Sequence, residues 1–432
     1  MGLGRATTVS FASQVASLAI TFLSGVVIAR VLGPPGKGTY SLVVLTYAFV
    51  VLIGNFGVPV FVASTIGKQK HTVDALLRNS FFFFACSTVL VSCVFLILKA
   101  WLGQHAPLAP FLGLLAVVIP LGLLTEHLAA FLQGLNRIGR FALTRVIGQL
   151  VTMFLLLVLF LSHPGIWMAL YCWLAGEVMS VVVTLALVWP FARPGISFLP
   201  SLFKESLGFG GAVCLSHFIG MASLRLDVFL VAYFLGASAV GLYSVAVAVS
   251  SLIMYLPSAL AVALLPRFSS AKAEESYELV ARACRMAILW GLGCAVVLFA
   301  VGGVLIRAVY GNAFSPSVNA MIILLPGTIL FGLAHITNAY FNGFAGRPAI
   351  NTGLAAVNVV IGIGLDLFLI PAFGIAGASL ASSVAYVLSM TVTLTVFSRV
   401  SGRTPLPLLA VRKNDFSELG RFVSVNVRTL VR

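Results

Sequence analysis

The sequence predicts an all-α polytopic membrane protein with twelve transmembrane helices, arranged as two pseudo-twofold-related six-helix lobes around a central cavity. The first observation is composition. Hydrophobic residues make up 60% of the 432 residues and charged residues only 9%, and the mean hydropathy of +1.11 is far outside the soluble range. The second observation is a short motif that occurs twice, 203 positions apart, each time between two apolar stretches.

The apolar stretches are long enough to cross about 30 Å of hydrocarbon as helices of roughly 20 residues each. They are too long and too uniformly apolar for the strands of a membrane β-barrel. We expect six spans in each half of the chain, at 7–32, 39–66, 79–102, 109–134, 141–161, 167–190, 206–235, 240–265, 281–305, 317–344, 349–370 and 375–398.

The repeated motif covers 29–33 and 38–41 in the first half, and 232–236 and 241–244 in the second. In both copies the first part ends in Leu-Gly and the second part in Tyr-Ser. Two tandem copies of one helix bundle are typical of secondary transporters, in which two lobes rock about a shared axis and open a midplane site to either side in turn.

The same reasoning gives the domain boundaries and the orientation. With a cytoplasmic N-terminus, 21 of the 26 lysines and arginines lie in inner segments, so both termini are expected in the cytoplasm of a plasma (inner) membrane protein. Basic inner loops also account for the net charge of +15 without nucleic acid, and they attract anionic membrane lipids. The expected domains are an N-lobe at 1–190, an inter-lobe linker at 191–204, a C-lobe at 205–398 and a basic tail at 399–432.

The sequence gives no sign of an enzyme. The outer connections are short, and a membrane enzyme with a soluble acceptor needs paired acid and base groups, usually on a sizeable loop. The six cysteines fall inside spans without metal-binding spacing. No Walker sequence is present, so we expect no cofactor, no bound metal and no direct use of ATP. Two energy sources stay open: an ion gradient, or downhill movement driven by consumption of the product outside.

Three parts of the sequence resemble a known family. They are the joint at 29–40, the stretch from Arg225 and Asp227 through 235–244, and the tail pattern at 405–415. All three are similar to the polysaccharide transporter branch of the multidrug/oligosaccharidyl-lipid/polysaccharide exporter superfamily, the flippases for lipid-linked (O-antigen type) oligosaccharides. This resemblance implies that the chain moves a polyprenyl-diphosphate-linked oligosaccharide from the inner to the outer leaflet by alternating access of its lobes.

The chain departs from two relatives of that branch. The related peptidoglycan-precursor flippases usually carry fourteen spans, and this sequence has no room for two more. The cation-coupled multidrug exporters usually rely on an acidic residue in the first helix, where this chain has Gln14 as its only strongly polar midspan residue. Two alternatives stay open: a cation-coupled drug antiporter of the same superfamily, with an acid-lined cavity, and a non-transport membrane component of a glycan assembly complex, with no cavity.

Polar residues inside the spans are the candidates for the substrate site, because ionisable groups at that depth are costly. In the seventh span, Arg225 and Asp227 are about 200° apart around the helix. We expect Arg225 to face the cavity and bind the diphosphate, with His217 on the same helix, and Asp227 to turn to a neighbouring helix. The alternative is that these groups only hold the bundle together.

A second set of candidates comes from the repeat. Aligning Gly134 with Gly343 places Glu126 opposite His335 and Gln133 opposite Asn342. We expect these side chains to bind sugar hydroxyls from both lobes, although polar contacts between helices would produce the same pattern. The full list of substrate-binding candidates is Arg225, His217, Glu126, Gln133, His335, Asn338, Asn342 and Arg30.

Acidic residues inside the spans are candidates for a coupling-ion site that takes a proton or sodium. They are Asp227, Glu177 and Asp366. The alternative for each is a buried, hydrogen-bonded acid with no role in transport.

The charge distribution makes a prediction about topology. On a cysteine-free background, single cysteines at Ser270 and Ser401 should react only with reagents that reach the cytoplasm, and one at Asn312 should react with an impermeant reagent from outside. Labelling of the Ser401 position from outside would contradict the twelve-span topology.

Overall fold

The computed structural model describes residues 3–68, 70–102, 108–191, 198–270, 272–412 and 415, with the backbone alone at 3–12 and 98–102. Within these residues all regular structure is helical. The chain divides into two compact units, residues 1–218 and 219–432, so the boundary falls inside one helix. The middle of the predicted linker, 192–197, and the tail at 413–414 and 416–432 lie outside the described residues.

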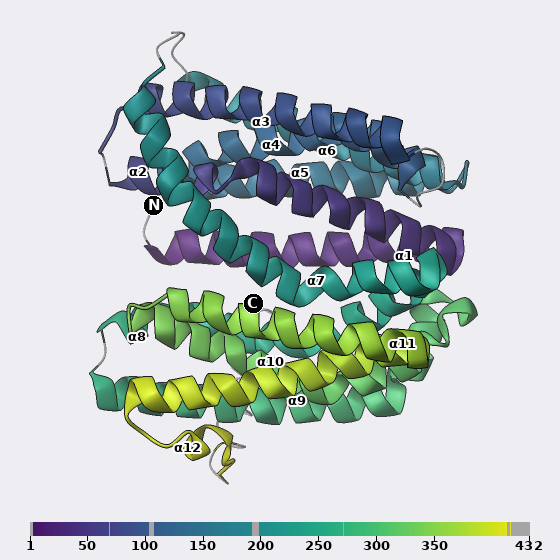
Figure 1. Cartoon of the computed structure of the whole chain (residues 1–432), viewed down its shortest axis with the longest axis vertical. Helices are drawn as coiled ribbons and strands as arrows, with labels where there is room; N and C mark the ends of the chain where they lie inside the picture. The colour runs from purple at the N-terminus through teal and green to yellow at the C-terminus, as the bar shows by residue number, and fades with distance from the viewer. Residues whose placement is uncertain are drawn as a thin grey trace. The chain divides into compact units, whose positions relative to one another are not determined.

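The first unit is a bundle in which α3, α4, α5 and α6 run side by side (Figure 1). Its elements are α1 (Leu3–Asn55), α2 (Val58–Gly67), α3 (Val73–Leu102), η1 (Ala109–Phe111), α4 (Leu112–Gly134), α5 (Ile138–Leu155), the π-helical turn η2 (Leu156–Phe160), α6 (Ile166–Val188), η3 (Trp189–Phe191) and the first part of α7 (Pro200–Ser250).

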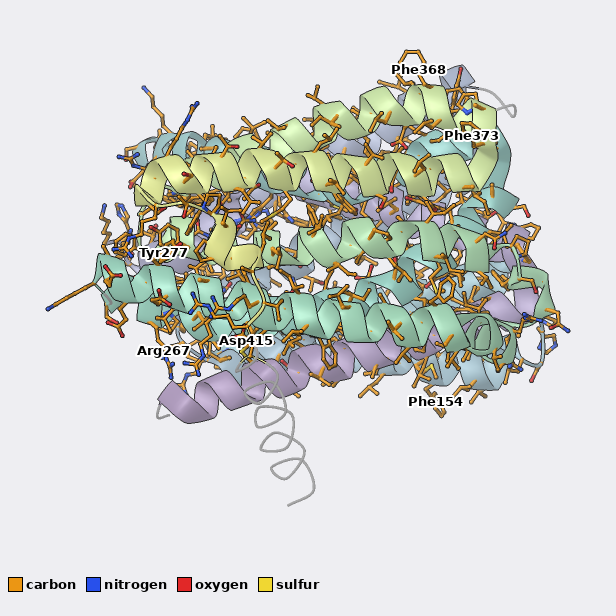
Figure 2. All side chains as sticks on the ribbon, turned by 90° about the horizontal axis from the view of Figure 1, so that it is seen from below. Phe154, Arg267, Tyr277, Phe368, Phe373 and Asp415 are labelled. Atoms are coloured by element: carbon orange, nitrogen blue, oxygen red, sulfur yellow. The ribbon has the colours of Figure 1, made fainter. Side chains whose placement is uncertain are left out.

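The second unit packs α8, α9 and α11 around α10. Its elements are the rest of α7, η4 (Ser251–Met254), α8 (Tyr255–Ser270), α9 (Ala273–Tyr310), η5 (Asn312–Phe314), α10 (Ser317–Gly343), α11 (Ala349–Ser401) and α12 (Leu406–Leu409). Large apolar side chains cover its outer surface, as lipid requires. Phe368, for example, is 79% exposed and lies with Phe373 at the end of the unit far from Tyr277 (Figure 2).

Nine of the described helical segments are long and apolar enough to cross a membrane. Three of them are broken in the middle by a glycine with non-helical dihedral angles: Gly33 in α1, Gly236 in α7 and Gly374 in α11. Each of these three segments therefore holds two spans, so the described chain has the twelve predicted spans. The predicted all-α class is confirmed.

The sequence repeat is also a repeat of backbone conformation. Gly33 has φ 64° and ψ −171°, and Gly236 has φ 81° and ψ −179°. Only glycine adopts this region without considerable strain. The chain therefore turns in the same way at the joint between the first two spans of each half, which explains why both copies of the motif carry glycine there.

The aligned pair Gly134 and Gly343 makes equivalent contacts in the two units. A Cβ atom on Gly134 of α4 would lie 3.0 Å from the carbonyl oxygen of Ala63 on α2. A Cβ atom on Gly343 of α10 would lie 3.0 Å from the carbonyl oxygen of Leu265 on α8. Such close approach of helix backbones is typical of small residues in membrane proteins. The two glycine contacts place α4 and α10 at equivalent positions in their units. Both helices are largely buried: 67% of the apolar stretch of α4 and 56% of that of α10 lie inside the protein.

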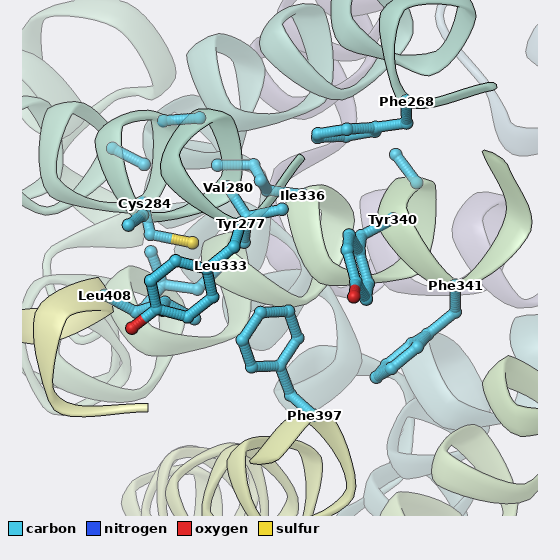
Figure 3. Packing of buried hydrophobic residues seen from close by; sticks show 14 of the residues in the cluster. Phe268, Tyr277, Val280, Cys284, Leu333, Ile336, Tyr340, Phe341, Phe397 and Leu408 are labelled. Carbon is cyan, nitrogen blue, oxygen red and sulfur yellow. The ribbon is translucent and has the colours of Figure 1, made fainter. Parts of the chain in front are cut away.

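Part of the predicted tail folds back on the second unit. Leu408 of α12 is fully buried in the apolar cluster that α8, α9, α10 and α11 build around Phe341 and Phe397 (Figure 3). The buried Arg285 guanidinium of α9 donates to Asp415 at 2.8 Å and to the Pro407 carbonyl at 3.1 Å.

The contacts of Asp415 also affect its pKa. Burial raises the pKa of Asp415, but the hydrogen bonds from the Arg412 backbone N–H and the Arg285 guanidinium outweigh burial and hold that pKa below its usual value. Asp415 is therefore charged at neutral pH, and the start of the tail is anchored on α9.

Two of the glycines in α7, Gly236 and Gly220, predict a difference in stability. Gly236→Ala should lower the free energy of unfolding by about 1–3 kcal/mol, because alanine is strained at this φ and ψ. Gly220→Ala is the matched control, since Gly220 has open space around it and no positive φ. The heat-unfolding midpoint in detergent should fall for the first variant and stay level or rise for the second. Equal midpoints would contradict the role assigned to the joint.

Candidate functional site

The second unit holds a polar cluster around Asp227. The Asp227 carboxylate accepts a hydrogen bond from the Tyr243 hydroxyl at 2.5 Å, from the Ser382 hydroxyl at 3.3 Å and from the Val228 backbone N–H at 2.8 Å. Tyr243 follows the glycine joint of α7 and is fully buried, and Ser382 lies in the second span of α11. The joint at Gly236 thus turns the chain back so that Tyr243 meets Asp227. As predicted from its angular position, Asp227 contacts a neighbouring helix.

A pocket opens beside this cluster, with an empty volume of about 320 Å³ when its open mouth is included. Six polar side chains line it: Ser223, Asp227, Asn358, Asp366, Ser382 and Tyr386. The side-chain amide of Asn358 donates to the Ser223 hydroxyl at 2.7 Å and to the Ser223 carbonyl at 3.0 Å.

Two buried oxygen atoms of this pocket have no hydrogen-bond partner among the described residues. They are Oδ1 of Asn358 and Oδ1 of Asp366. The two residues are eight positions apart on α11, about 80° around the helix. A buried oxygen without a hydrogen-bond donor is costly. Together with the Asp227 carboxylate, these two oxygens give the pocket oxygen ligands of the kind that a sodium ion takes, and its carboxylates can also take a proton.

The predicted phosphate ligand, Arg225, lies on the surface of α7, two residues before Asp227. None of the ion pairs among the described residues includes Arg225. His217, two turns earlier on the same helix, is also exposed. Their exposure agrees with contact to a polar ligand, and their binding role stays a prediction.

The first unit has its own half-buried acid, Glu177 on α6. Its carboxylate accepts hydrogen bonds from the Tyr47 hydroxyl at 3.0 Å and from the Trp173 indole N–H at 3.2 Å. Gly122 on α4 makes room for this arrangement, because a Cβ atom there would lie 2.2 Å from the Tyr47 hydroxyl oxygen. Glu177 is therefore held by α1 and by its own helix in a site that two aromatic rings cover.

Glu126, predicted to bind sugar, has a charged partner that the sequence reasoning missed. The Arg145 guanidinium of α5 donates to the Glu126 carboxylate at 2.7 Å. Arg145 is one of the 21 basic residues assigned to inner segments, although it also lies within the predicted span at 141–161, and the structure places it two turns inside α5. Its place within that predicted span was the signal that could have marked it as a charged residue inside the bundle.

The candidates on α10 are tied to α11. The Asn351 side-chain amide donates to the Asn342 side-chain oxygen at 2.8 Å and to the Asn338 carbonyl at 3.1 Å. His335 lies against the Phe331 ring. These contacts are of the kind expected from polar groups that hold helices together, so a sugar-binding role for this stripe stays a prediction.

The remaining substrate-binding candidates are exposed. Gln133 lies near the end of α4, and Arg30 lies just before the joint at Gly33. Their proposed contact with substrate also stays a prediction.

The sequence matches one protein family and several individual relatives. The family described as "Polysaccharide biosynthesis protein" matches residues 27–319. A putative O-antigen transporter of Shigella flexneri is 22% identical over 386 residues, covering 86% of this chain and 92% of the relative. The probable flippase AglR of Haloferax volcanii is 23% identical over 410 residues, covering 90% of this chain and 81% of the relative.

Solved structures share the fold. The lipid II flippase MurJ in an inward closed conformation matches with a TM-score of 0.77 at 14% identity, over 99% of both chains. An inward-facing multidrug resistance MATE family transporter of the MOP superfamily matches with a TM-score of 0.73 at 17% identity, over 90% of this chain and 95% of that chain. These matches confirm the predicted two-lobe, twelve-helix fold class.

Proposed function

The chain belongs to the polysaccharide biosynthesis protein family, and we propose that it is a flippase for polyprenyl-diphosphate-linked oligosaccharides that works by alternating access of its two lobes. The family match over residues 27–319 carries this proposal. The relatives in Shigella flexneri and Haloferax volcanii, named as a putative transporter and a probable flippase, point in the same direction.

The chemistry of the second unit supports this substrate class. A diphosphate entering a membrane span needs a cation that stays charged and can donate two parallel hydrogen bonds, which a guanidinium provides. Arg225 is such a group, exposed within an apolar helix. In the proposed flippase it holds the diphosphate while the polyprenyl chain stays in the lipid.

The proposed location and chemistry follow from this role. The protein spans the plasma membrane with both termini in the cytoplasm, where its basic inner segments meet anionic lipid head groups. It changes the leaflet in which its substrate lies and makes or breaks no covalent bond, so it is not an enzyme.

A flipping assay tests the function. In proteoliposomes, a lipid-linked oligosaccharide placed in one leaflet should become accessible to a glycosidase on the other side only when the protein is present. Arg225→Ala should slow this roughly tenfold or more, and Arg225→Lys should restore part of the rate, because lysine keeps the charge without the planar fork. Arg267→Ala, which removes an exposed charge at the end of α8, is the control and should flip normally.

Other outcomes distinguish the alternatives. Uptake of organic cations without any flipping would support the drug antiporter. Absence of both activities from a folded, reconstituted protein would support a non-transport component of a glycan assembly complex.

The pocket beside Asp227 is the proposed coupling-ion site. Its two carboxylates and the unpartnered oxygens of Asn358 and Asp366 suit a hard cation or a proton. Flipping driven by the ion gradient requires an ion that enters and leaves with each cycle, and a small pocket with an open mouth permits this. Glu177 of the first unit is the second candidate, although its carboxylate already accepts two hydrogen bonds.

The ion site predicts a specific loss of coupling. If sodium or a proton is the driving ion, Asp366→Asn should abolish acceleration of flipping by that gradient and leave only slow, downhill movement. Glu275→Gln, the same loss of charge at the exposed start of α9, should leave the response intact. Applying a sodium gradient at constant pH, and then a pH gradient without sodium, identifies the ion. A normal gradient response in Asp366→Asn would remove this pocket from the mechanism.

A further inference from the structure

The first unit carries an ion pair between Glu126 and Arg145 that lies well inside the apolar spans. Glu126 is eight residues before the end of α4, and Arg145 is seven residues after the start of α5. At a rise of 1.5 Å per residue, both are about 10–12 Å from the ends of their helices. Both helices belong to stretches with the length and composition of membrane spans.

This ion pair is exposed in spite of its depth. The Arg145 side chain is 55% exposed and the Glu126 side chain 36% exposed. Charges at such a position cannot face lipid at a reasonable cost, and in membrane proteins they face water or a polar path. The pair therefore lines a space that a polar ligand can reach.

The Arg145 guanidinium has N–H donors that the ion pair with Glu126 does not use. One nitrogen, Nη2, donates to Oε1 of Glu126, and the carbon at the centre of the group lies 5.7 Å from the middle of the Phe141 ring. The ring and the carboxylate fix the direction of the group, and the remaining N–H donors can form a bidentate contact with an anion.

We infer that Arg145 is an anion-binding residue of the first unit and that it binds the phosphate or another acidic group of the transported substrate. When no anion is bound, the Glu126 carboxylate pairs with the Arg145 guanidinium. This inference rests on the proposed function. It adds a second anion-binding arginine, in the unit that does not contain Arg225. Glu126 then competes with the anion for the guanidinium, in place of the sugar contact that its sequence position predicted.

The surroundings of the pair fit this exchange. Tyr47 and Glu177 lie close enough to Glu126 and Arg145 to interact with them electrostatically. Among the described residues of this cluster Arg145 is the basic side chain, so it is the group that attracts an incoming anion. An exposed pair of this kind contributes little to folding, so its position inside a span calls for another reason.

Direct binding tests the inference without any need for flipping. The probes are farnesyl diphosphate, which has the carrier's phosphates and no sugar, and a glucuronate disaccharide, which has an acidic sugar and no phosphate. Binding to the full-length protein in detergent is measured by isothermal titration. Arg145→Ala should weaken binding of at least one probe roughly tenfold or more. Glu126→Gln should strengthen binding of the same probe, because the competing carboxylate is gone.

The control is Arg140→Ala, which removes an equal charge near the start of the same helix. It should leave binding unchanged, and heat-unfolding midpoints should show that all three variants are folded. A loss confined to farnesyl diphosphate identifies the carrier phosphates as the ligand, and a loss confined to the disaccharide identifies an acidic sugar.

Two results would overturn the inference. One is unchanged binding of both probes to folded Arg145→Ala, and the other is weaker binding to Glu126→Gln, which would show that the pair acts as one structural unit. Either can occur while wild-type protein flips lipid-linked oligosaccharide, so failure here is separate from failure of the proposed function. If wild-type protein binds a probe through Arg145 but flips nothing, the anion site stands and the flippase proposal falls.

Discussion

The structure depends on one constraint: a polar group inside a hydrocarbon span must find a partner or reach water. Asp227 is satisfied by Tyr243 and Ser382, and Glu177 by Tyr47 and Trp173. Each carboxylate is held by at least one residue beyond its own span. Bringing these partners together requires sharp turns at glycine joints and close helix contacts at small residues. The placement of glycine along the chain follows from this need.

The two units meet the constraint in parallel ways. Each has a bent pair of spans at its start, a largely buried helix held by a close glycine contact, a half-buried acid bound to a tyrosine, and an exposed arginine within its spans. In the second unit Asp366 and Asn358 keep oxygens without partners beside a pocket. The pocket beside these two oxygens supports the proposed coupling-ion site in the second unit, and the first unit carries the charge pair that we propose an anion can separate.

Much of the fold could be predicted from the sequence because lipid imposes a simple rule on length and composition. The twelve spans and the joints at Gly33 and Gly236 followed from that rule and from the repeat. The partners of polar groups could not be predicted, since they come from distant parts of the chain. Tyr243 belongs to the repeated motif, yet nothing local showed that its hydroxyl binds Asp227. Arg145 lies within the predicted span at 141–161, but its pairing with Glu126 on another helix was missed. The folded tail was missed because its anchor is the distant Arg285.

The central claim is that two rigid units carry these groups past each other during transport. It is tested most directly by distances between spin labels on a background without the six native cysteines. One pair joins Gln133 of the first unit to Asn342 of the second, which are exposed and equivalent in the repeat, and a control pair joins Gln133 to Ser162 within the first unit. The account predicts two distance populations for the first pair, with proportions that change when lipid-linked oligosaccharide is added, and one unchanged population for the control. A single distance between the units that substrate does not alter would contradict it.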